Sequence, residues 1–224
     1  LGSYKGINGS SACEKCEAGT YLTESGRSVC TVCPAGNRSN SLVGSDEATD
    51  CLCNAGYSGP DGGQCVACAP GEYKGVNGSS SCVTCSSGTY LNVSAGTVCV
   101  TCPAGVFSNS PPGSVEVDAC LCNAGYTGPD GGQCTACLPG EFKGINGSSS
   151  CVLCAAGEYL NTSAGTACDG CPSGNLSNSL PGSDAVTDCL CLPGYTGPDG
   201  GLCVACELGS YKGINGSSAC EKCE

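Results

Sequence analysis

The stretch that decides the fold is CNAGYSGPDGGQC, which runs from Cys53 to Cys65. It recurs as CNAGYTGPDGGQC at Cys122–Cys134 and as CLPGYTGPDGGLC at Cys191–Cys203, in steps of 69 residues. The cysteines around it keep the same step, with no insertion or deletion between copies. Self-similarity at a fixed period is typical of an array of small units, each of which contacts mainly its neighbours.

The period divides the chain into three cysteine-rich repeats, 1–69, 70–138 and 139–207, followed by the start of a fourth at 208–224. Residues 208–224 read LGSYKGINGSSACEKCE, which is also the sequence of residues 1–17. We therefore expect the chain to be one period, with an overlap, of a much longer array. Recent duplication within a short protein is the alternative.

Composition indicates covalent stabilisation. The 224 residues include 26 cysteines and 37 glycines, but two Phe, no Trp and no Met, which is too little large apolar surface for one core. The absence of His excludes Ser-His-Asp and Cys-His catalytic pairs and His-ligated zinc. Disulfides are favoured over a metal-thiolate protein because the cysteines are spread over long loops, which predicts an oxidising, extracellular or cell-surface location.

Net charge and hydropathy limit the kinds of partner that this chain can bind. A net charge of −12 argues against nucleic-acid binding. The segment has no apolar run long enough to span a membrane and no signal-peptide pattern, so we expect a processed or excised segment of a secreted chain. We expect no cofactor other than N-linked glycans.

Helix signals are weak because glycine interrupts every stretch and no 3.6-residue period persists. Residues 20–22 and 98–100 are candidate strands for two-stranded hairpins. Such ribbons are marginal alone, so the cross-links must hold them. The predicted fold class is small disulfide-rich repeats, mostly irregular loops with short two-stranded β-hairpins, arranged as an elongated linear array.

Two families share these spacings. The segment C-x-C-x-x-G-Y-x-G…C resembles the last three cysteines of an epidermal-growth-factor-like (EGF-like) module. The wider pattern CxxCxPGEYKG…CxxC…CPxG…CxC…GY resembles the cysteine-rich repeat of ephrin-receptor ectodomains, and this resemblance covers essentially the whole chain. The extra Cys68, Cys137 and Cys206 depart from a six-cysteine module.

The EGF-like resemblance implies the pairs 16–33, 30–51 and 53–65, with Cys68 reaching forward to Cys82 and with Cys13 and Cys223 unpaired. Modules of tumour-necrosis-factor receptors imply instead 13–30, 16–33, 51–68 and 53–65. The final pair is common to both, and it involves Cys53, Cys65, Cys122, Cys134, Cys191 and Cys203. The other cysteines of the favoured scheme are Cys16, Cys33, Cys30, Cys51, Cys68, Cys82, Cys85, Cys102, Cys99, Cys120, Cys137, Cys151, Cys154, Cys171, Cys168, Cys189, Cys206 and Cys220.

Three further features recur in register. Aromatic residues recur at three positions of the repeat, where we expect structural packing, with carbohydrate stacking as the functional alternative. A lysine follows the first of them in each copy (Lys5, Lys74, Lys143 and Lys212). We expect it to be solvated, with an ion pair to a neighbouring chain as the alternative. The GPDGG loops predict a turn with Pro60 in its second position, and their single carboxylate is too few oxygens for calcium. We therefore predict no metal site and no catalytic residue.

Glycosylation is the strongest site-level prediction. Sequons of the form N-x-[ST] are more frequent than the Ser and Thr content explains, and one of them occupies the same position in every copy. The candidate asparagines are Asn8, Asn37, Asn77, Asn92, Asn146, Asn161, Asn175 and Asn215.

A constant repeat suits a structural role. We expect a glycoprotein that self-associates as the shaft of an extracellular filament or surface hair, with protist flagellar hairs (mastigonemes) as the most concrete example. The alternative is the stalk or ectodomain of a receptor, adhesin or surface antigen, which would need a divergent recognition loop. An enzyme is not expected, because near-equivalent copies of every carboxylate offer no differentiated pocket.

Overall fold

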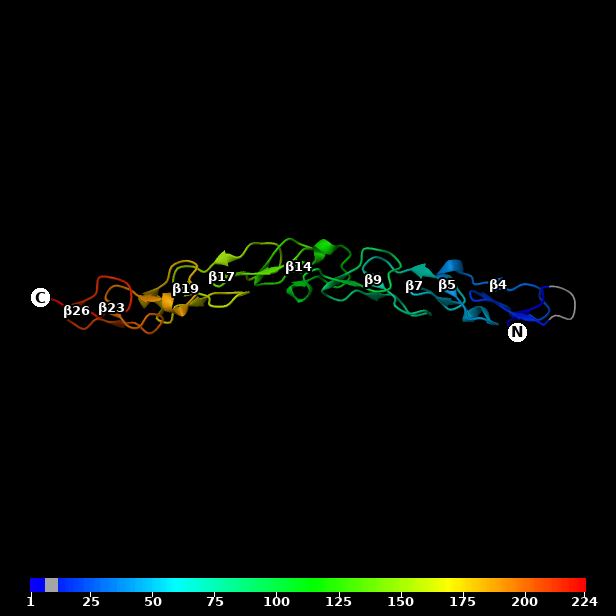
Figure 1. Ribbon diagram of the computed structural model, residues 1–224, viewed down its shortest axis with the longest axis horizontal. Coiled ribbons are helices and arrows are strands. Elements are labelled where there is room, and N and C mark those ends of the chain that lie inside the picture. Colours follow the sequence, from blue (N-terminus) through cyan, green and yellow to red (C-terminus); the bar gives the residue numbers. More distant parts are fainter. Residues whose placement is uncertain (7–11) are drawn as a thin grey trace. The chain divides into compact units, whose positions relative to one another are not determined.

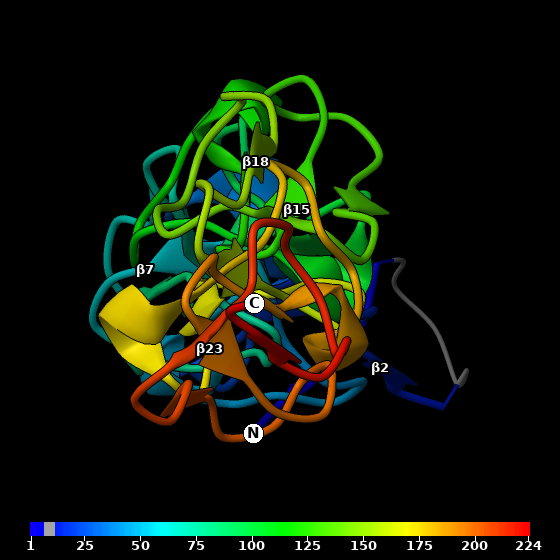
Figure 2. The ribbon, with the colours of Figure 1, turned by 90° about the vertical axis from the view of Figure 1, so that its left-hand side faces the viewer.

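The computed structural model describes residues 1–6 and 12–224 as a succession of two-stranded antiparallel hairpins (Figure 1). These residues form thirteen such sheets and six short 3-10 helices, and no α-helix. Figure 2 shows the same ribbon turned by 90°, with short strands such as β18 and β23 set among long loops. The prediction of disulfide-rich tandem repeats with short two-stranded hairpins is confirmed.

Every strand is two residues long. In the first repeat the strands are β1 (Ser3–Tyr4), β2 (Glu14–Lys15), β3 (Thr20–Tyr21), β4 (Thr31–Val32), β5 (Ser39–Asn40), β6 (Leu52–Cys53), β7 (Tyr57–Ser58) and β8 (Val66–Ala67). In the second they are β9 (Glu72–Tyr73), β10 (Val83–Thr84), β11 (Thr89–Tyr90), β12 (Val100–Thr101), β13 (Ser108–Asn109), β14 (Leu121–Cys122), β15 (Tyr126–Thr127) and β16 (Thr135–Ala136).

The later copies follow the same order. Their strands are β17 (Glu141–Phe142), β18 (Val152–Leu153), β19 (Glu158–Tyr159), β20 (Asp169–Gly170), β21 (Ser177–Asn178), β22 (Leu190–Cys191), β23 (Tyr195–Thr196), β24 (Val204–Ala205), β25 (Ser210–Tyr211) and β26 (Glu221–Lys222). The 3-10 helices are η1 (Gly36–Arg38), η2 (Ala48–Asp50), η3 (Gly105–Phe107), η4 (Val117–Ala119), η5 (Gly174–Leu176) and η6 (Val186–Asp188).

A tight turn leads into most hairpins. The Thr20 backbone N–H donates to the carbonyl oxygen of Glu17 at 3.1 Å, and Gly19 between them has φ 80°. A positive φ at the third position is what a type II turn requires, which explains the glycine. The following strand pairs with a partner about ten residues later, as Thr20 does with Val32. The strand predicted at residues 20–22 is thus present as β3, whereas that predicted at 98–100 starts only at Val100.

Contacts divide the chain into two compact units. One comprises residues 1–102 and 110–119, and the other comprises residues 103–109 and 120–224. Each contains hairpins and disulfides of the same kinds.

Sulfur fills the place of an apolar core. Among the described residues, sixteen of the twenty buried apolar side chains are cysteines, and the others are Leu22, Leu91, Leu160 and Ala104. Most Val, Ile and Leu side chains are exposed, such as Leu42 at 83 % and Val66 at 67 %. A bridge that closes a loop of about 15 residues contributes about 3 kcal/mol in the chain-entropy model, so the cross-links can replace the missing burial.

The cysteines come in C-x2-C and C-x-C pairs, and each disulfide joins the second cysteine of one pair to the first cysteine of the following pair. Cys102 and Cys120 are also disulfide-bonded, and Cys13 and Cys223 are free and exposed. The bonds are 16–30, 33–51, 53–65, 68–82, 85–99, 122–134, 137–151, 154–168, 171–189, 191–203 and 206–220.

This connectivity corrects both pairing schemes in the first part of each repeat. The bonds 16–30 and 33–51 replace the expected 16–33 and 30–51, and also 13–30 and 51–68 of the alternative scheme. Cys16 and Cys33 each follow the second strand of a hairpin, and their backbone N–H groups bond to the glycine that opens it. Each therefore faces the loop of the next hairpin, where Cys30 lies 5.8 Å from Cys16 between Cα atoms, a normal disulfide separation.

The bonds Cys68–Cys82, Cys137–Cys151 and Cys206–Cys220 run from one 69-residue repeat into the next. Covalent links thus cross the boundaries at 69/70, 138/139 and 207/208. The division of the chain into the repeats 1–69, 70–138, 139–207 and 208–224 stays a prediction that rests on the sequence period alone.

Candidate functional site

Three lysines at one position of the repeat are buried. The exposed fractions of Lys74, Lys143 and Lys212 are 2 %, 3 % and 5 %. The expectation of a solvated lysine is therefore wrong at these three positions. Burial of an ammonium group is costly unless its protons are hydrogen-bonded, so the partners of these lysines decide what they do.

Backbone carbonyl groups surround each buried ammonium group, and we name this arrangement the lysine cage. Lys74 Nζ donates to the carbonyl oxygens of Tyr57 at 2.8 Å and Gly78 at 2.5 Å, with that of Cys53 at 3.5 Å. Lys143 Nζ donates to Tyr126 at 2.7 Å and to Gly147, and Lys212 Nζ to Tyr195 at 2.8 Å and to Gly216.

The backbone of the same lysine also forms hydrogen bonds to both neighbouring hairpins. The Lys74 carbonyl accepts from Gly56 N–H at 2.8 Å, and Lys74 N–H donates to the carbonyl of Gly96 at 3.1 Å. A Cβ atom on Gly56 would lie 2.2 Å from the carbonyl oxygen of Ala95, so only glycine permits this approach. The lysine thus ties together the hairpins on both sides of a repeat boundary.

Burial acts on the charge of these lysines. Desolvation lowers the pKa of Lys74 and Lys143, and the nearby carboxylates of Asp61 and Asp130 partly oppose that change in pKa. Asp61 Oδ1 is buried without a hydrogen-bond partner among the described residues. Asp130 instead accepts a hydrogen bond from Ser148 at 3.3 Å. The GPDGG loop therefore places its carboxylate beside the lysine cage.

The GPDGG turn differs from its prediction in one respect. Gly63 N–H donates to the carbonyl of Pro60 at 2.9 Å, so Pro60 occupies the first position of the turn and not the second. Gly62, with φ 73°, then occupies the third position, as in the turns that open the hairpins. Gly62 N–H donates to the carbonyl oxygen of Cys51 at 2.8 Å, which ties the turn to the residue that follows η2.

The predicted glycosylation sites face solvent. Asn8 lies outside the described residues. The other candidate asparagines are all exposed, namely Asn37, Asn77, Asn92, Asn146, Asn161, Asn175 and Asn215.

The sequon loop, Asn77–Ser79 and its equivalents, adjoins the lysine cage because its central glycine supplies one of the carbonyl groups. Asn77 Oδ1 accepts from Ala55 N–H at 2.9 Å, and Asn146 Oδ1 accepts from Ala124 N–H at the same distance. In the next copy Pro193 stands at the equivalent position and has no N–H to donate. Sequence reasoning missed this anchor, although the change from Ala to Pro was visible.

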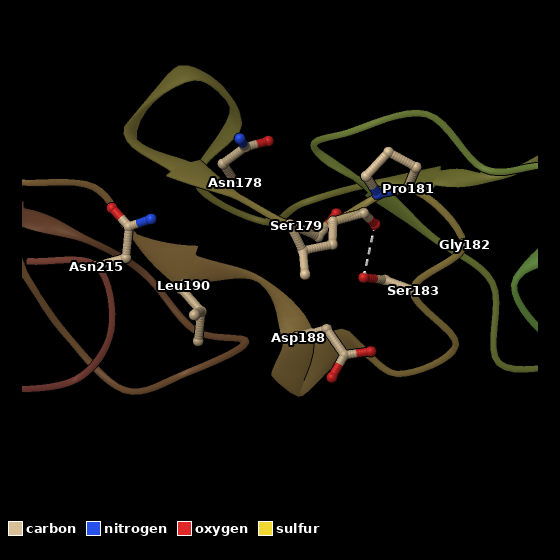
Figure 3. Close-up of a pocket in the computed structure, with 9 residues that line it drawn as sticks. Asn178, Ser179, Pro181, Gly182, Ser183, Asp188, Leu190 and Asn215 are labelled. Carbon is tan, nitrogen blue, oxygen red and sulfur yellow. Dashed lines mark hydrogen bonds between the residues drawn. The ribbon is translucent and has the colours of Figure 1, made fainter.

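An open groove of about 550 Å³ lies beside the sequon loop of Asn215. Figure 3 shows Asn178, Pro181, Asp188 and Asn215 around it. The Ser183 hydroxyl donates to the carbonyl oxygen of Leu180 at 2.8 Å, so it is bonded within the loop 180–183 that lines the groove. A groove of about 340 Å³ occupies the equivalent place in the first repeat, around Leu42 and Asp50.

These grooves carry no catalytic constellation of their own. Asp188 is the one ionisable side chain that lines the larger groove. Across residues 1–6 and 12–224, no group of three or more His, Cys, Asp or Glu side chains is arranged to hold a metal ion. The recurring features of this molecule are thus hairpins, cross-links, buried lysines and exposed sequons.

Comparison with known families matches this repeat pattern. The family model described as tyrosine-protein kinase ephrin type A/B receptor-like matches residues 2–51, 71–120 and 140–189, about two thirds of the chain. The chain belongs to the ephrin-receptor-like family. The matches begin 69 residues apart, and each ends on the first cysteine of the C-x-C-x-x-G-Y-x-G…C segment. A comparison with curated proteins finds no match.

Ephrin-receptor-like repeats rich in disulfides indicate an extracellular role, either structural or as part of a receptor ectodomain, and an extracellular or secreted location. Modules of this kind are typically non-catalytic. In the part of the chain that the structure describes, no helix has the length and apolar character needed to cross a bilayer.

Proposed function

We propose that this ephrin-receptor-like array is a structural glycoprotein segment that forms the shaft of an extracellular filament or surface hair. The observation that carries this proposal is the succession of disulfides that join neighbouring cysteine pairs within each unit. Bonds such as Cys68–Cys82 fasten each repeat to the next, and the lysine cages repeat at the same junctions. A covalently stapled array transmits tension along its length without relying on a core that could unfold.

N-linked glycans are the expected covalent partners of this filament. The exposed asparagines of the sequon loops would present them at 69-residue intervals, as at Asn77 and Asn146. Ser39 and Ser177, the third residues of two other sequons, are buried in the folded chain. Glycosylation at Asn37 and Asn175 would therefore have to precede folding of their hairpins.

The second candidate is the stalk or ectodomain of a receptor, adhesin or surface antigen, as the family itself favours. A stalk needs the same cross-links but no contacts between copies. We propose no catalytic activity and no cofactor for either role, because every feature of the site is a structural contact. Mastigonemes are the most concrete example of the filament role.

Electron microscopy of the native material distinguishes the filament role from the ectodomain role. The filament role predicts uniform fibrils whose axial period corresponds to an integer number of repeats. Monodisperse particles, or single stalks attached to a membrane, would contradict it and support the ectodomain role.

A further inference from the structure

One loop distinguishes the second repeat from the other two. The 3-10 helices η1 and η5 carry the sequons Asn37-Arg-Ser and Asn175-Leu-Ser, whereas η3 carries Val106-Phe107-Ser108 at the same position. The backbone of the three is alike, since the residue after each helix has φ of −132° to −134° and ψ of 158° to 159°. In the second repeat, the glycan site predicted at this position of the other two repeats is therefore replaced by two apolar side chains on a backbone of the same conformation.

These apolar side chains are exposed and held in place. Val106 is 84 % exposed and Phe107 is 43 % exposed. The Phe107 ring stacks on Tyr126 with centroids 4.8 Å apart, and the backbone carbonyls of Phe107 and Val106 accept from Asn123 N–H and Asn123 Nδ2. An aromatic side chain that is already ordered loses little entropy on binding, which suits it to an interface.

We infer that Val106, Phe107 and Tyr126, which we name the bare patch, form a contact between two copies of this chain. The inference deepens the proposed filament role and rests on it, because it states where neighbouring copies meet. A two-fold contact uses the same surface on both partners, so one patch is sufficient.

Two observations favour a second copy as the occupant. The second repeat has one lysine and four acidic residues, a net charge of −3, which equals that of the first repeat and is half the −6 of the third. Electrostatic repulsion between copies is therefore weaker at the second repeat than at the third. The bare patch also occurs where the other repeats are predicted to carry glycans, which would keep copies apart at every other equivalent loop.

A sugar ligand fits the patch less well. Carbohydrate sites need free polar groups beside the aromatic ring. The neighbouring side-chain amides are already used within the chain, because Asn123 Nδ2 donates to Val106 and Gln133 Nε2 donates to the carbonyl of Pro103 at 3.0 Å. A contact of this size is weak alone and gains strength when it recurs along an array.

Residues that stand at these positions in the other repeats are compatible with the same backbone, and they suggest the substitutions to test. Val106→Asn creates a sequon that reads N-F-S, in register with those of the other repeats, and should place a glycan on the patch. Phe107→Arg copies Arg38 of the first repeat. The double substitution Asn37→Val with Arg38→Phe transplants the patch to the first repeat, where Tyr57 corresponds to Tyr126.

The experiment is sedimentation equilibrium of the glycosylated chain over a wide concentration range. We expect the unsubstituted chain to associate reversibly into dimers, and both Val106→Asn and Phe107→Arg to weaken association by about tenfold or more, as loss of a buried aromatic anchor does. The transplanted patch should strengthen association. Val106→Gln, which adds polarity without a sequon, separates the effect of the glycan from that of lost apolar surface.

Dimers that persist unchanged in Val106→Asn and Phe107→Arg would overturn the inference, and so would a chain that stays monomeric at every concentration. Binding of the monomer to immobilised N-glycans, lost in Phe107→Arg, would assign the patch to carbohydrate instead. Fibrils seen by microscopy without dimerisation through the patch would refute this inference alone. Dimers through the patch without fibrils would refute the filament role alone.

Discussion

The lysine of each repeat boundary contributes hydrogen bonds across the junction. Lys74 supplies three polar protons to backbone carbonyl groups that lie away from solvent, and two of these contacts are 2.8 Å or shorter. Methionine has a similar length but cannot donate, so its substitution leaves those carbonyls unsatisfied. An unsatisfied buried acceptor costs about 1–3 kcal/mol, partly offset because the ammonium group no longer has to be desolvated.

We therefore predict that Lys74→Met opens the junction locally. Amide hydrogen exchange should accelerate at Gly56 and Gly78, whose N–H groups donate to Lys74 and Cys53 across the boundary. The expected acceleration is about tenfold or more, since about 1.4 kcal/mol corresponds to a factor of ten. Lys222→Met, at an exposed lysine, serves as the matched control. Unchanged exchange at Gly56 and Gly78 would show that the lysine cage does not hold the junction.

The same burial predicts a dependence on pH. Because desolvation lowers the pKa of Lys74 and Lys143 in the folded chain below the ordinary 10.5, the unfolded chain binds more protons between the lowered pKa and 10.5. Stability from these groups should therefore rise with pH through that window and be constant below it. Unfolding by denaturant should show this rise in a Cys13→Ser, Cys223→Ser background, and the rise should shrink in Lys74→Met. A fall in stability over that window would contradict the assignment.

The sequon asparagines offer a comparison within one chain. Asn77 is anchored by the N–H of Ala55, whereas the residue equivalent to Ala55 in the copy of Asn215 is Pro193, which has no N–H. In protein refolded without glycans, Asn77→Ala should cost about 1 kcal/mol of stability, the typical net value of one hydrogen bond. Asn215→Ala should cost less than half of that. Equal losses in denaturant unfolding would mean that the Asn77 side chain is not an anchor.

At the scale of the hairpin, one backbone position carries strain. Ala95 and Ala164 have φ of 56° and 58°, and Gly26 has φ 80° at the same place in the first repeat. The left-handed region costs a residue with a Cβ atom about 1–2 kcal/mol, and glycine loses about 0.5–1 kcal/mol more entropy on folding. We predict that Ala95→Gly stabilises the chain by about 0.5–1 kcal/mol.

The exposed strand residue Ala67 is the control for that substitution, because Ala67→Gly should destabilise by about 0.5–1 kcal/mol. Denaturant midpoints of the two variants compare them directly. If both variants lost stability equally, the conformation at Ala95 would not be strained.

The hairpins were predictable from the sequence, but the pairing of the cysteines that hold them was not. The weak helix signals, the candidate strands and the many cysteines predicted short ribbons held by disulfides. Spacing alone does not say which cysteine a hairpin end faces, and Cys16 pairs with Cys30 because the end of one hairpin lies against the loop of the next. The EGF-like and tumour-necrosis-factor-receptor patterns both failed at that step.

The buried lysines show a second limit of sequence reasoning. A single Lys among polar and glycine residues indicates a solvated side chain, and only the folded loops reveal that carbonyl groups converge on Lys74, Lys143 and Lys212. The sequence did contain the regular recurrence of that lysine. Its burial depends on contacts between residues about twenty positions apart, which periodicity does not describe.

Across the described residues of the molecule, covalent links between successive hairpins replace an apolar core. The sixteen buried cysteines and four other buried apolar residues among the described residues are the basis of that claim. Because each bond closes a loop of similar length, with sequence separations from 12 in Cys53–Cys65 to 18 in Cys33–Cys51, the stabilisation is spread evenly over the repeats.

The most direct test is mass spectrometry of peptides from the unreduced protein, cut between Cys30 and Cys33 so that the two can be told apart. We expect peptides that link Cys16 to Cys30 and Cys33 to Cys51, and a link between repeats at Cys68–Cys82. Peptides that link Cys16 to Cys33, or free thiols at these positions, would contradict this expectation.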